Sequence, residues 1–256
     1  MKPLSVVIIT FNEEKNIARC LESVKDLADE IVVVDSLSQD HTQGICRQYG
    51  VRLIEQPFLG YIEQKNFALA QAKYDHVLSL DADEALDETL YRSVAEAKQA
   101  GFPYDGYMMS RCANYCGKWI RHGKWYPDRK LRLLNRQKGK WGGTNPHDKI
   151  EMVAGASIFR LRGDILHYTY YTIDEHIQQM NRFTTIQSEA MLKKGKRSTI
   201  FHVIFNPVSA FITGYIFKKG FLEGIDGFLI AKSVAYQTLL KYVKLLQLQR
   251  KHHITG

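Results

Sequence analysis

Four short apolar runs alternate with helical patterns over the first 110 residues of the chain. Residues 4–10 (LSVVIIT) and 30–36 (EIVVVDS) are almost continuously apolar, as expected of strands that are covered on both faces. Residues 51–56 and 75–84 predict a third and a fourth strand. A helical pattern follows each strand, within residues 13–27, 36–50, 60–73 and 86–101. This alternation predicts an α/β fold with a mainly parallel, Rossmann-like sheet flanked by helices.

Polar side chains stand at the carboxyl ends of three of these predicted strands. In open parallel sheets, ligands bind beyond the carboxyl ends of the strands. The sequence therefore predicts one ligand site at one sheet edge, with contributions from Thr10, Asn12, Glu13, Asp35, Ser36, Asp81 and Asp83.

The acids that end the fourth run require a positive partner. Neither of the common phosphate-binding loops, GxGxxG and GxxxxGK[ST], occurs in the chain. Asp81 and Asp83 are the oxygen ligands that Mg²⁺ or Mn²⁺ prefers, and such an ion bridges to the phosphates of a substrate. The pattern therefore favours a divalent cation that neutralises a nucleotide diphosphate.

Three motifs in order carry a resemblance to a known family. SVVIITFNEEKNIARCLESV, EIVVVDSLSQDHT and SLDADE, with the DxD at Asp81-Ala82-Asp83, resemble the family 2 glycosyltransferases. These are inverting enzymes with the GT-A fold that use nucleotide-diphosphate sugars. The combination of the three motifs is far more specific than a lone DxD, and the resemblance is strong over residues 4–110.

The second half resembles one branch of that family. GKWIRHGKWYPDRKLRLLNRQKGKW, PHDKIE and LHYTYYTIDEHIQQMNRFT are similar to bacterial lipopolysaccharide inner-core β-1,4-glucosyltransferases. The branch implies transfer of a hexose, glucose, from a UDP-sugar to a heptose. Another cell-surface polysaccharide, a lipid or a protein is the alternative acceptor.

The resemblance implies roles for the residues that match the donor-binding motifs. Asp35 would accept a hydrogen bond from the base, commonly the imino N–H of uracil, and Lys65 would face the nucleotide. Phe11 would lie against the base in a pocket lined by Thr10, Phe11, Asn12 and Glu13.

The resemblance also implies a metal site. Asp83 would ligate the ion directly, and Asp81 would face the ribose or the metal and its water. His167, in DILHY, has the position of a late histidine that completes the metal site in several GT-A enzymes. It is a candidate metal ligand or diphosphate contact, with a core histidine as the alternative.

An inverting displacement needs a base that takes the proton of the acceptor hydroxyl. Asp148, in TNPHDKIE, lies at the distance from the DxD that suits the family, and Asp128, in WYPDRK, is the runner-up. His147 is adjacent to Asp148 and would orient the base or the acceptor. Arg129 and Arg132 suit an acceptor rich in phosphate, since guanidinium groups match phosphate oxygens, and a solvated basic face is the alternative.

The tail combines apolar runs with basic residues. Residues 200–217 are uncharged, which reaches the lower limit for a membrane span, but Asn206-Pro207 is expected to break a helix there. Residues 228–251 predict an amphipathic helix. A basic, helical appendage over 191–256 that lies on the anionic inner face of the cytoplasmic membrane is therefore expected. A membrane span and a packing or dimerisation module are the alternatives.

Charge separates the chain into an acidic front and a basic rear. Residues 1–110 carry 10 basic against 18 acidic side chains, residues 111–190 carry 14 against 7, and residues 191–256 carry 11 against 2. We expect these segments to be a nucleotide-sugar-binding half, an acceptor-binding half and the appendage. The basic rear suits an anionic partner.

Two further function classes are disfavoured. A nucleic-acid-binding protein would have to accommodate the acidic sheet edge, and no known binding motif occurs. A dinucleotide-dependent oxidoreductase is disfavoured because this chain lacks the glycine loop of that class.

The four cysteines form no CxxC pair and are expected to be reduced. The first apolar run is too short for a signal-peptide core, so a cytoplasmic location, peripheral on the membrane, is expected.

Overall fold

The structure is a computed structural model that describes residues 2–144 and 147–254, with the side chains of His147 and of 251–254 outside the description. The chain divides into two compact units. The first contains residues 1–112 and 128–168, and the second contains 113–127 and 169–256. This division differs from the expected segments, because 113–127 belongs to the second unit and the expected boundary at 190 lies inside a helix.

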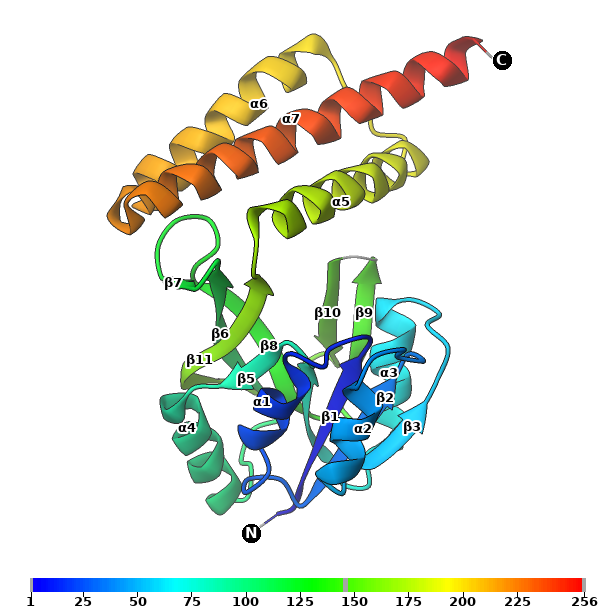
Figure 1. Ribbon diagram of the computed structural model, residues 1–256, viewed down its shortest axis with the longest axis vertical. Helices are drawn as coiled ribbons and strands as arrows, with labels where there is room; N and C mark the ends of the chain where they lie inside the picture. The colour runs from blue at the N-terminus through cyan, green and yellow to red at the C-terminus, as the bar shows by residue number, and fades with distance from the viewer. Residues whose placement is uncertain (1, 145–146, 255–256) are drawn as a thin grey trace. The chain divides into compact units, whose positions relative to one another are not determined.

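The first unit is built on the predicted parallel strands. They are β1 (Leu4–Thr10), β2 (Glu30–Asp35), β3 (Arg52–Glu55) and β4 (His76–Asp81), and they pair in the order β3-β2-β1-β4. The sheet continues from β4 through β8 (Asp128–Asn135), β6 (Gly106–Tyr115), β11 (Ile158–Tyr170) and β5 (Glu84–Leu86). β8 is antiparallel to β4 and β6, and β11 is antiparallel to β5, so the sheet is mixed (Figure 1).

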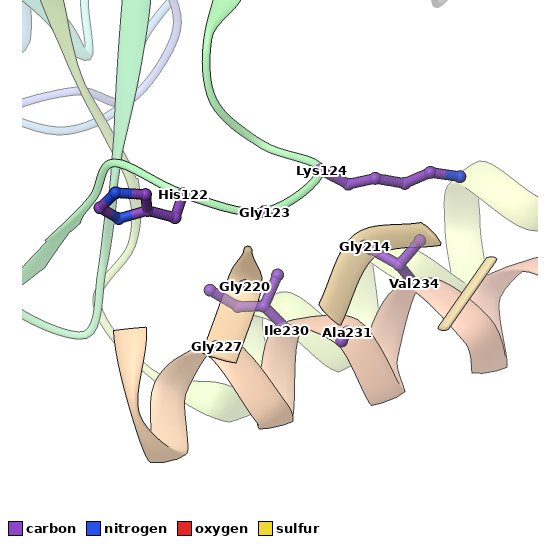
Figure 2. A pocket seen from close by; sticks show the side chains of 9 residues that line it. All are labelled: His122, Gly123, Lys124, Gly214, Gly220, Gly227, Ile230, Ala231 and Val234. Carbon is purple, nitrogen blue, oxygen red and sulfur yellow. The ribbon is translucent and has the colours of Figure 1, made fainter. Parts of the chain in front are cut away.

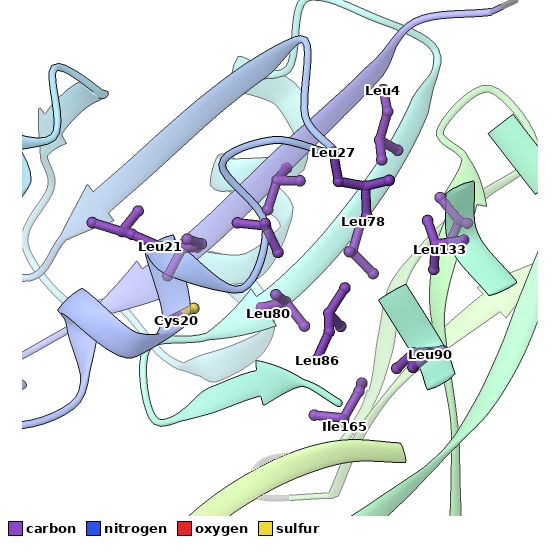
Figure 3. Close-up of a cluster of buried hydrophobic side chains, with 14 of the residues drawn as sticks. Leu4, Cys20, Leu21, Leu27, Leu78, Leu80, Leu86, Leu90, Leu133 and Ile165 are labelled. Atoms are coloured by element: carbon purple, nitrogen blue, oxygen red, sulfur yellow. The ribbon is translucent and has the colours of Figure 1, made fainter. Parts of the chain in front are cut away.

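Both faces of the parallel strands are covered, which explains why their sequences are apolar throughout. One face packs under α1 (Ile17–Glu22), α2 (Thr42–Gln48) and α4 (Glu88–Gln99). Figure 3 shows this larger core, where Leu78 and Leu80 of β4 lie near Leu21 and Leu90 of the helices.

The other face packs under α3 (Tyr61–Gln71) and a separate hairpin of β9 (Gly139–Thr144) and β10 (His147–Met152). Val7 of β1 points into this second core, whereas Val6 and Ile8 point into the first. This alternation is the two-residue period of a strand.

α1 is much shorter than its sequence pattern predicts. It ends at Glu22, although Val24 and Leu27 beyond it are still buried. The Ser23 hydroxyl donates to the carbonyl of Cys20, and the Val24 N–H reaches back only three residues to Leu21. Local side-chain bonding of this kind competes with the helical ladder, so the segment continues as turns.

The second unit is mainly helical. It contains β7 (Lys118–Ile120), α5 (Ile173–Lys193), α6 (Ile200–Ile212), the π-helix η1 (Thr213–Phe217), the 3-10 helix η2 (Gly220–Glu223) and α7 (Ile225–Ile254). α7 contacts both α5 and α6. The helical character predicted for the tail is present, but the expected break is wrong, because α6 runs through Pro207.

A small pocket in the second unit is lined largely by glycines and apolar residues (Figure 2). Its space of about 10 Å³ holds roughly one water molecule. The close packing requires glycine, because a Cβ on Gly227 would lie 1.9 Å from the carbonyl oxygen of Gly220. The pocket is therefore a packing feature and too small for a sugar or a nucleotide.

Candidate active site

The polar ends of β1, β2 and β4 meet at one edge of the sheet, as the sequence predicts. In the parallel register, Thr10 pairs with Asp35, and the neighbouring Ile9 pairs with Asp81. The hydroxyl of Thr10 is buried and has no hydrogen-bond partner among the described residues. An unpartnered buried hydroxyl is uncommon, and at this edge it is available to a ligand.

The DxD turn is fastened to β11. The N–H of Tyr168 donates to the carbonyl of Asp83 over 2.9 Å, and β5 pairs with β11 so that Glu84 lies opposite His167. As a result Nε2 of His167 lies 3.0 Å from Oδ2 of Asp83. The structure thus brings together the two candidate metal ligands, which are 84 residues apart in the sequence.

Asp81 has a different environment from Asp83. Nζ of Lys65 lies 3.0 Å from its Oδ1, and Nη2 of Arg132 lies 3.1 Å from its Oδ2. Burial alone would raise the pKa of Asp81, but the charges of Lys65 and Arg132 outweigh burial and hold that pKa well below its usual value. Lys65 and Arg132 therefore compensate the charge of Asp81 in this structure, and its contact with a metal stays a prediction.

Asp81 belongs to a continuous series of ion pairs, which we call the charge ladder. Neighbouring members carry opposite charges, with Arg132 bound to Glu84 over 2.8 Å and Arg111 bound to Asp128 over 2.8 Å. Four acids alternate with four bases, in the order Asp148, Lys65, Asp81, Arg132, Glu84, Arg111, Asp128 and Lys130. The ladder compensates its own charge, so the positive partner of most of the acids after β4 is protein and not metal.

The two candidate bases stand near opposite ends of the ladder. Lys65 binds Oδ2 of Asp148 at 2.8 Å, and Oδ1 makes no hydrogen bond to the described residues. Asp128 is bound through both oxygens, since Arg111 donates twice to Oδ2 and Lys130 lies 3.1 Å from Oδ1. Asp148 therefore retains an open oxygen that Asp128 lacks.

The hairpin that carries Asp148 is anchored to α3 by one side chain. Asn66 donates to the carbonyl of Trp141 over 2.9 Å and accepts from the Trp141 N–H over 3.0 Å. Lys65, the preceding residue on α3, forms an ion pair with Asp148 of β10. The buried indole of Trp141 lies between two ladder cations, with Lys65 Nζ at 4.5 Å and the Arg132 guanidinium carbon at 5.2 Å from its ring.

The loops after β1 and β2 are joined by hydrogen bonds. Asn12, with a positive φ of 54°, donates from its backbone to the Ser38 hydroxyl, and the Glu13 N–H donates to the Thr42 hydroxyl. Asp35 is fully buried and accepts from Ser38 and from the amide of Gln43. A carboxylate has about four acceptor positions, so the predicted bond to the base would use the remaining one. That role stays a prediction.

Phe11 and Glu13 lie in the first of these loops. The ring of Phe11 is 56% exposed, which suits a side chain that stacks on a base. Burial, followed by the negative charge of Asp83, raises the pKa of Glu13 from 4.5 to about 7. Ionised Glu13 is thus disfavoured beside Asp83 unless a cation is present.

The three residues predicted to contact the acceptor differ in their burial and in their partners. Arg129 is exposed at the start of β8. Arg132 is 2% exposed, and its guanidinium binds Asp81 and Glu84 within the charge ladder, so its contact with an acceptor stays a prediction. His147 begins β10, but its side chain lies outside the described residues.

Comparison with known proteins decides the family. Residues 5–158 match the model of glycosyl transferase family 2, which is more than half of the chain. The chain belongs to this family. Its fold is GT-A, and the protein is a glycosyltransferase.

Relatives of this glycosyltransferase align with nearly its whole length. It is 32% identical to the lipopolysaccharide core biosynthesis glycosyltransferase LpsC of Rhizobium meliloti, over 96% of this chain and 92% of LpsC. An uncharacterised glycosyltransferase of Rickettsia typhi is 31% identical over 98% of this chain and 89% of the relative. The mannosyltransferase PcManGT of Pyrobaculum calidifontis, solved with GDP-mannose and Mn²⁺, is 16% identical with a TM-score of 0.58, covering 96% of this chain and 87% of that one.

The donor set of the glycosyltransferase fits a divalent cation that is shared with a substrate. The described residues contain no group of three or more ligating side chains. Asp83 and His167 nevertheless supply one carboxylate oxygen and one imidazole nitrogen at 3.0 Å, close to the spacing of about 3 Å between adjacent ligands of an octahedral ion. A cation held by few side chains and completed by phosphate oxygens and water is the usual arrangement for Mg²⁺.

Sequence patterns do not indicate the roles of Glu84, Arg111 and Asn66 in this glycosyltransferase. Glu84 is 1% exposed and accepts from the Asp81 N–H as well as from Arg132, so it shapes the DxD turn. The available signal for Glu84 is its place among the acids that end the fourth apolar run, directly after the DxD. Arg111 and Asn66 lie in unremarkable strand and helix patterns that gave no signal.

Proposed function

We propose that this family 2 glycosyltransferase transfers glucose from UDP-glucose to an inner-core heptose of lipopolysaccharide, with inversion at the anomeric carbon. The observation that carries the proposal is the pairing of Asp83 with His167 at the sheet edge, in the same unit as Asp148. The likeness to LpsC, named for lipopolysaccharide core biosynthesis, supports the acceptor class. The resemblance of the donor motifs supports UDP.

In the proposed reaction, Asp83 and His167 would hold Mg²⁺ or Mn²⁺. When bound, the ion would supply Lewis-acid stabilisation of the charge that develops on the departing nucleoside diphosphate. Thr10, Phe11 and Asp35 bind the nucleoside at the ends of β1 and β2.

Asp148 serves as the base. Its Oδ1 accepts the proton of the attacking hydroxyl while Lys65 keeps Oδ2 in place, and a positioned base of this kind contributes roughly 10²–10⁴ in rate. The acceptor oxygen forms its bond to the anomeric carbon as the bond to the diphosphate breaks, so one displacement inverts the configuration. Arg129 and His147 are proposed to contact the phosphorylated acceptor.

The second unit is proposed to associate peripherally with the cytoplasmic membrane, where a lipid-linked acceptor is found. Among the described residues one segment, Ile200–Phe217, is long and apolar enough to cross a membrane. It lies in a unit whose residues 191–256 carry 11 basic and 2 acidic side chains. Such a composition favours an anionic surface.

A donor-hydrolysis screen over nucleotide sugars tests the donor. We expect UDP-glucose to be hydrolysed fastest, and only when Mg²⁺ or Mn²⁺ is present. Mass spectrometry of lipopolysaccharide from a deletion strain tests the acceptor, with loss of one hexose from the inner core as the expected result. An unchanged core would contradict the acceptor and favour another cell-surface polysaccharide, a lipid or a protein.

A further inference from the structure

The outward side of α6 and η1 is apolar over its whole length. Seven apolar side chains are each more than half exposed: Ile200 at the start of α6, and six that follow it, with Phe217 at 76%. The six are Phe201, Ile204, Phe205, Val208, Ile216 and Phe217. We call these six residues the outer face. The opposite side, which includes Ala210 and Gly214, is buried in the second unit, where α6 packs on α7 (Figure 1).

A helix on the surface of a protein in water normally has one apolar stripe and a polar opposite side. Here the side that faces away from the second unit is apolar, and the packed side contains the small buried residues Ala210 and Gly214. The rings of Phe201, Phe205 and Phe217 alone expose on the order of 400 Å². With the aliphatic members added, the outer face exceeds the few hundred Å² of contiguous apolar surface that a monomer usually exposes.

Exposed cations stand at both ends of the outer face. Lys196 and Arg197 precede α6, and Lys218 and Lys219 follow η1, with no charged residue in between. The two acids of residues 191–256 are compensated, since Glu223 lies 3.6 Å and Asp226 lies 3.2 Å from Nζ of Lys118. An apolar face bordered by cations complements a membrane that carries anionic headgroups, whereas a second copy of this chain would present like charges.

We propose that the outer face inserts into an anionic membrane with α6 lying in the plane of the membrane. This inference deepens the proposed function by naming the surface through which the enzyme reaches a lipid-linked acceptor. The Phe and Ile side chains enter the boundary between headgroups and acyl chains, and the four cations bind lipid phosphates.

Packing within the second unit favours this orientation over a span. The 18 residues of Ile200–Phe217 extend about 27 Å as a helix, slightly less than the hydrocarbon core of about 30 Å. A span would also carry α7 into the membrane, because Nζ of Lys232 lies 5.5 Å from the ring of Phe211 and 5.7 Å from that of Phe228. Lysine inside the hydrocarbon core is strongly disfavoured.

Flotation of the full chain with vesicles of phosphatidylcholine, with and without phosphatidylglycerol, tests the proposal. Wild type is expected to float with the anionic vesicles. Replacing Phe201→Ser and Phe205→Ser together should weaken binding by about tenfold or more. Replacing Lys218→Gln and Lys219→Gln together should weaken binding to anionic vesicles by roughly 30-fold, since each cation near the surface contributes about 1 kcal/mol.

Matched controls show whether binding depends on the outer face or on any exposed apolar or charged residues. Phe58 and Leu59 are 48% and 71% exposed in the first unit, so Phe58→Ser with Leu59→Ser should leave flotation unchanged. Lys138→Gln with Lys140→Gln is the control for charge. Equal loss of binding in either control would overturn the assignment.

Depth measurements separate insertion in the plane from a span. Three native cysteines are buried and Cys116 is exposed, so Cys116→Ser allows single nitroxide labels at positions 201, 208 and 217. Equal, shallow depths of roughly 5–10 Å are expected. A deep label at position 208 between shallow ones at 201 and 217 would demonstrate a span and overturn the proposal.

Failure of this proposal is distinguishable from failure of the proposed function. Metal-dependent hydrolysis of UDP-glucose needs no membrane, so the Phe201→Ser, Phe205→Ser variant should retain it. A wild-type chain that hydrolyses the donor but ignores anionic vesicles, or that buries the outer face in a dimer by sedimentation analysis, would overturn membrane insertion alone.

Discussion

Lys65 binds two carboxylates with different proposed tasks. One is Asp81, which ends β4, and the other is Asp148, which is proposed to accept the proton. The ammonium engages Oδ2 of Asp148, the proposed base, and leaves Oδ1 without a hydrogen bond to the residues that the structure describes. The arrangement separates the two carboxylates that the sequence offered as bases, since both oxygens of Asp128 are bound.

Substitution of the two aspartates tests this distinction. Asp148→Asn keeps the shape but cannot accept the proton, so kcat for sugar transfer should fall roughly 10²–10⁴-fold with little change in donor KM. Asp128→Asn should reduce kcat far less and lower thermal stability, because it weakens the pairing with Arg111. Steady-state kinetics decide the matter, and the reverse pattern would make Asp128 the base.

Glu13 predicts a pH-dependent stability in the absence of metal. Its pKa of about 7 in the folded protein lies above the unfolded value of 4.5, so the folded state binds the proton more tightly. This contribution is fully present below about pH 4.5 and is lost as pH rises through 7. Glu13→Gln should therefore raise Tm only slightly at pH 5 and clearly more at pH 8 in EDTA, by about 2–4 °C for each kcal/mol of destabilisation that the substitution relieves.

Calorimetric scans of both proteins at the two pH values provide the measurement. Adding Mn²⁺ at pH 8 should reduce the difference, because a cation near Asp83 compensates the charge of Glu13. A stabilisation by Glu13→Gln that is equal at pH 5 and pH 8 would show that Glu13 does not titrate in this range.

At the scale of elements, the β9–β10 hairpin carries Asp148, the proposed base. Asn66 on α3 makes two hydrogen bonds to the backbone of Trp141, and the neighbouring Lys65 binds Asp148. Removing the Asn66 amide leaves two backbone groups without partners, which costs about 1–3 kcal/mol for each buried group. The hairpin should then shift relative to α3.

Asn66→Ala is expected to lower kcat for transfer while leaving the donor KM within about twofold, because Thr10, Phe11 and Asp35, which are proposed to bind the nucleoside, lie on β1, β2 and the loop after β1. Asn66→Asp is the matched variant, since it retains one acceptor and loses the donor, and an intermediate kcat is expected. A rise in donor KM with unchanged kcat would place the hairpin at the nucleotide instead.

Some elements could be predicted from sequence and others could not, for identifiable reasons. β1, β2 and β4 are continuous apolar runs, and their ends share an edge because parallel strands point the same way. The charge ladder depends on β8 lying antiparallel beside β4, with Val77 opposite Leu134. No local pattern encodes that neighbour, so Arg132 reads as a surface cation although it is buried.

At the scale of the whole molecule, the chain separates its chemistry from its exposed apolar surface. All residues proposed to bind donor, metal or base lie in the first unit, and the outer face lies in the second. The acidic residues 1–110 lie in the first unit and the strongly basic residues 191–256 lie in the second, whereas the basic segment 111–190 is divided between the two units. Asp83 and its neighbour Glu13 are carboxylates of the sheet edge that lie outside the charge ladder.

Asp83 and His167 are proposed to hold a divalent cation that binds the donor diphosphate. Isothermal titration of UDP into wild type, Asp83→Asn and His167→Gln, each with Mn²⁺ or with EDTA, measures this directly. We expect Mn²⁺-dependent binding in wild type and affinity reduced at least about 10-fold in each variant, since even the residues that support metal ligands cost about 10–100-fold when they are replaced. UDP binding of equal affinity in EDTA, or in Asp83→Asn, would show that the two residues hold no such cation.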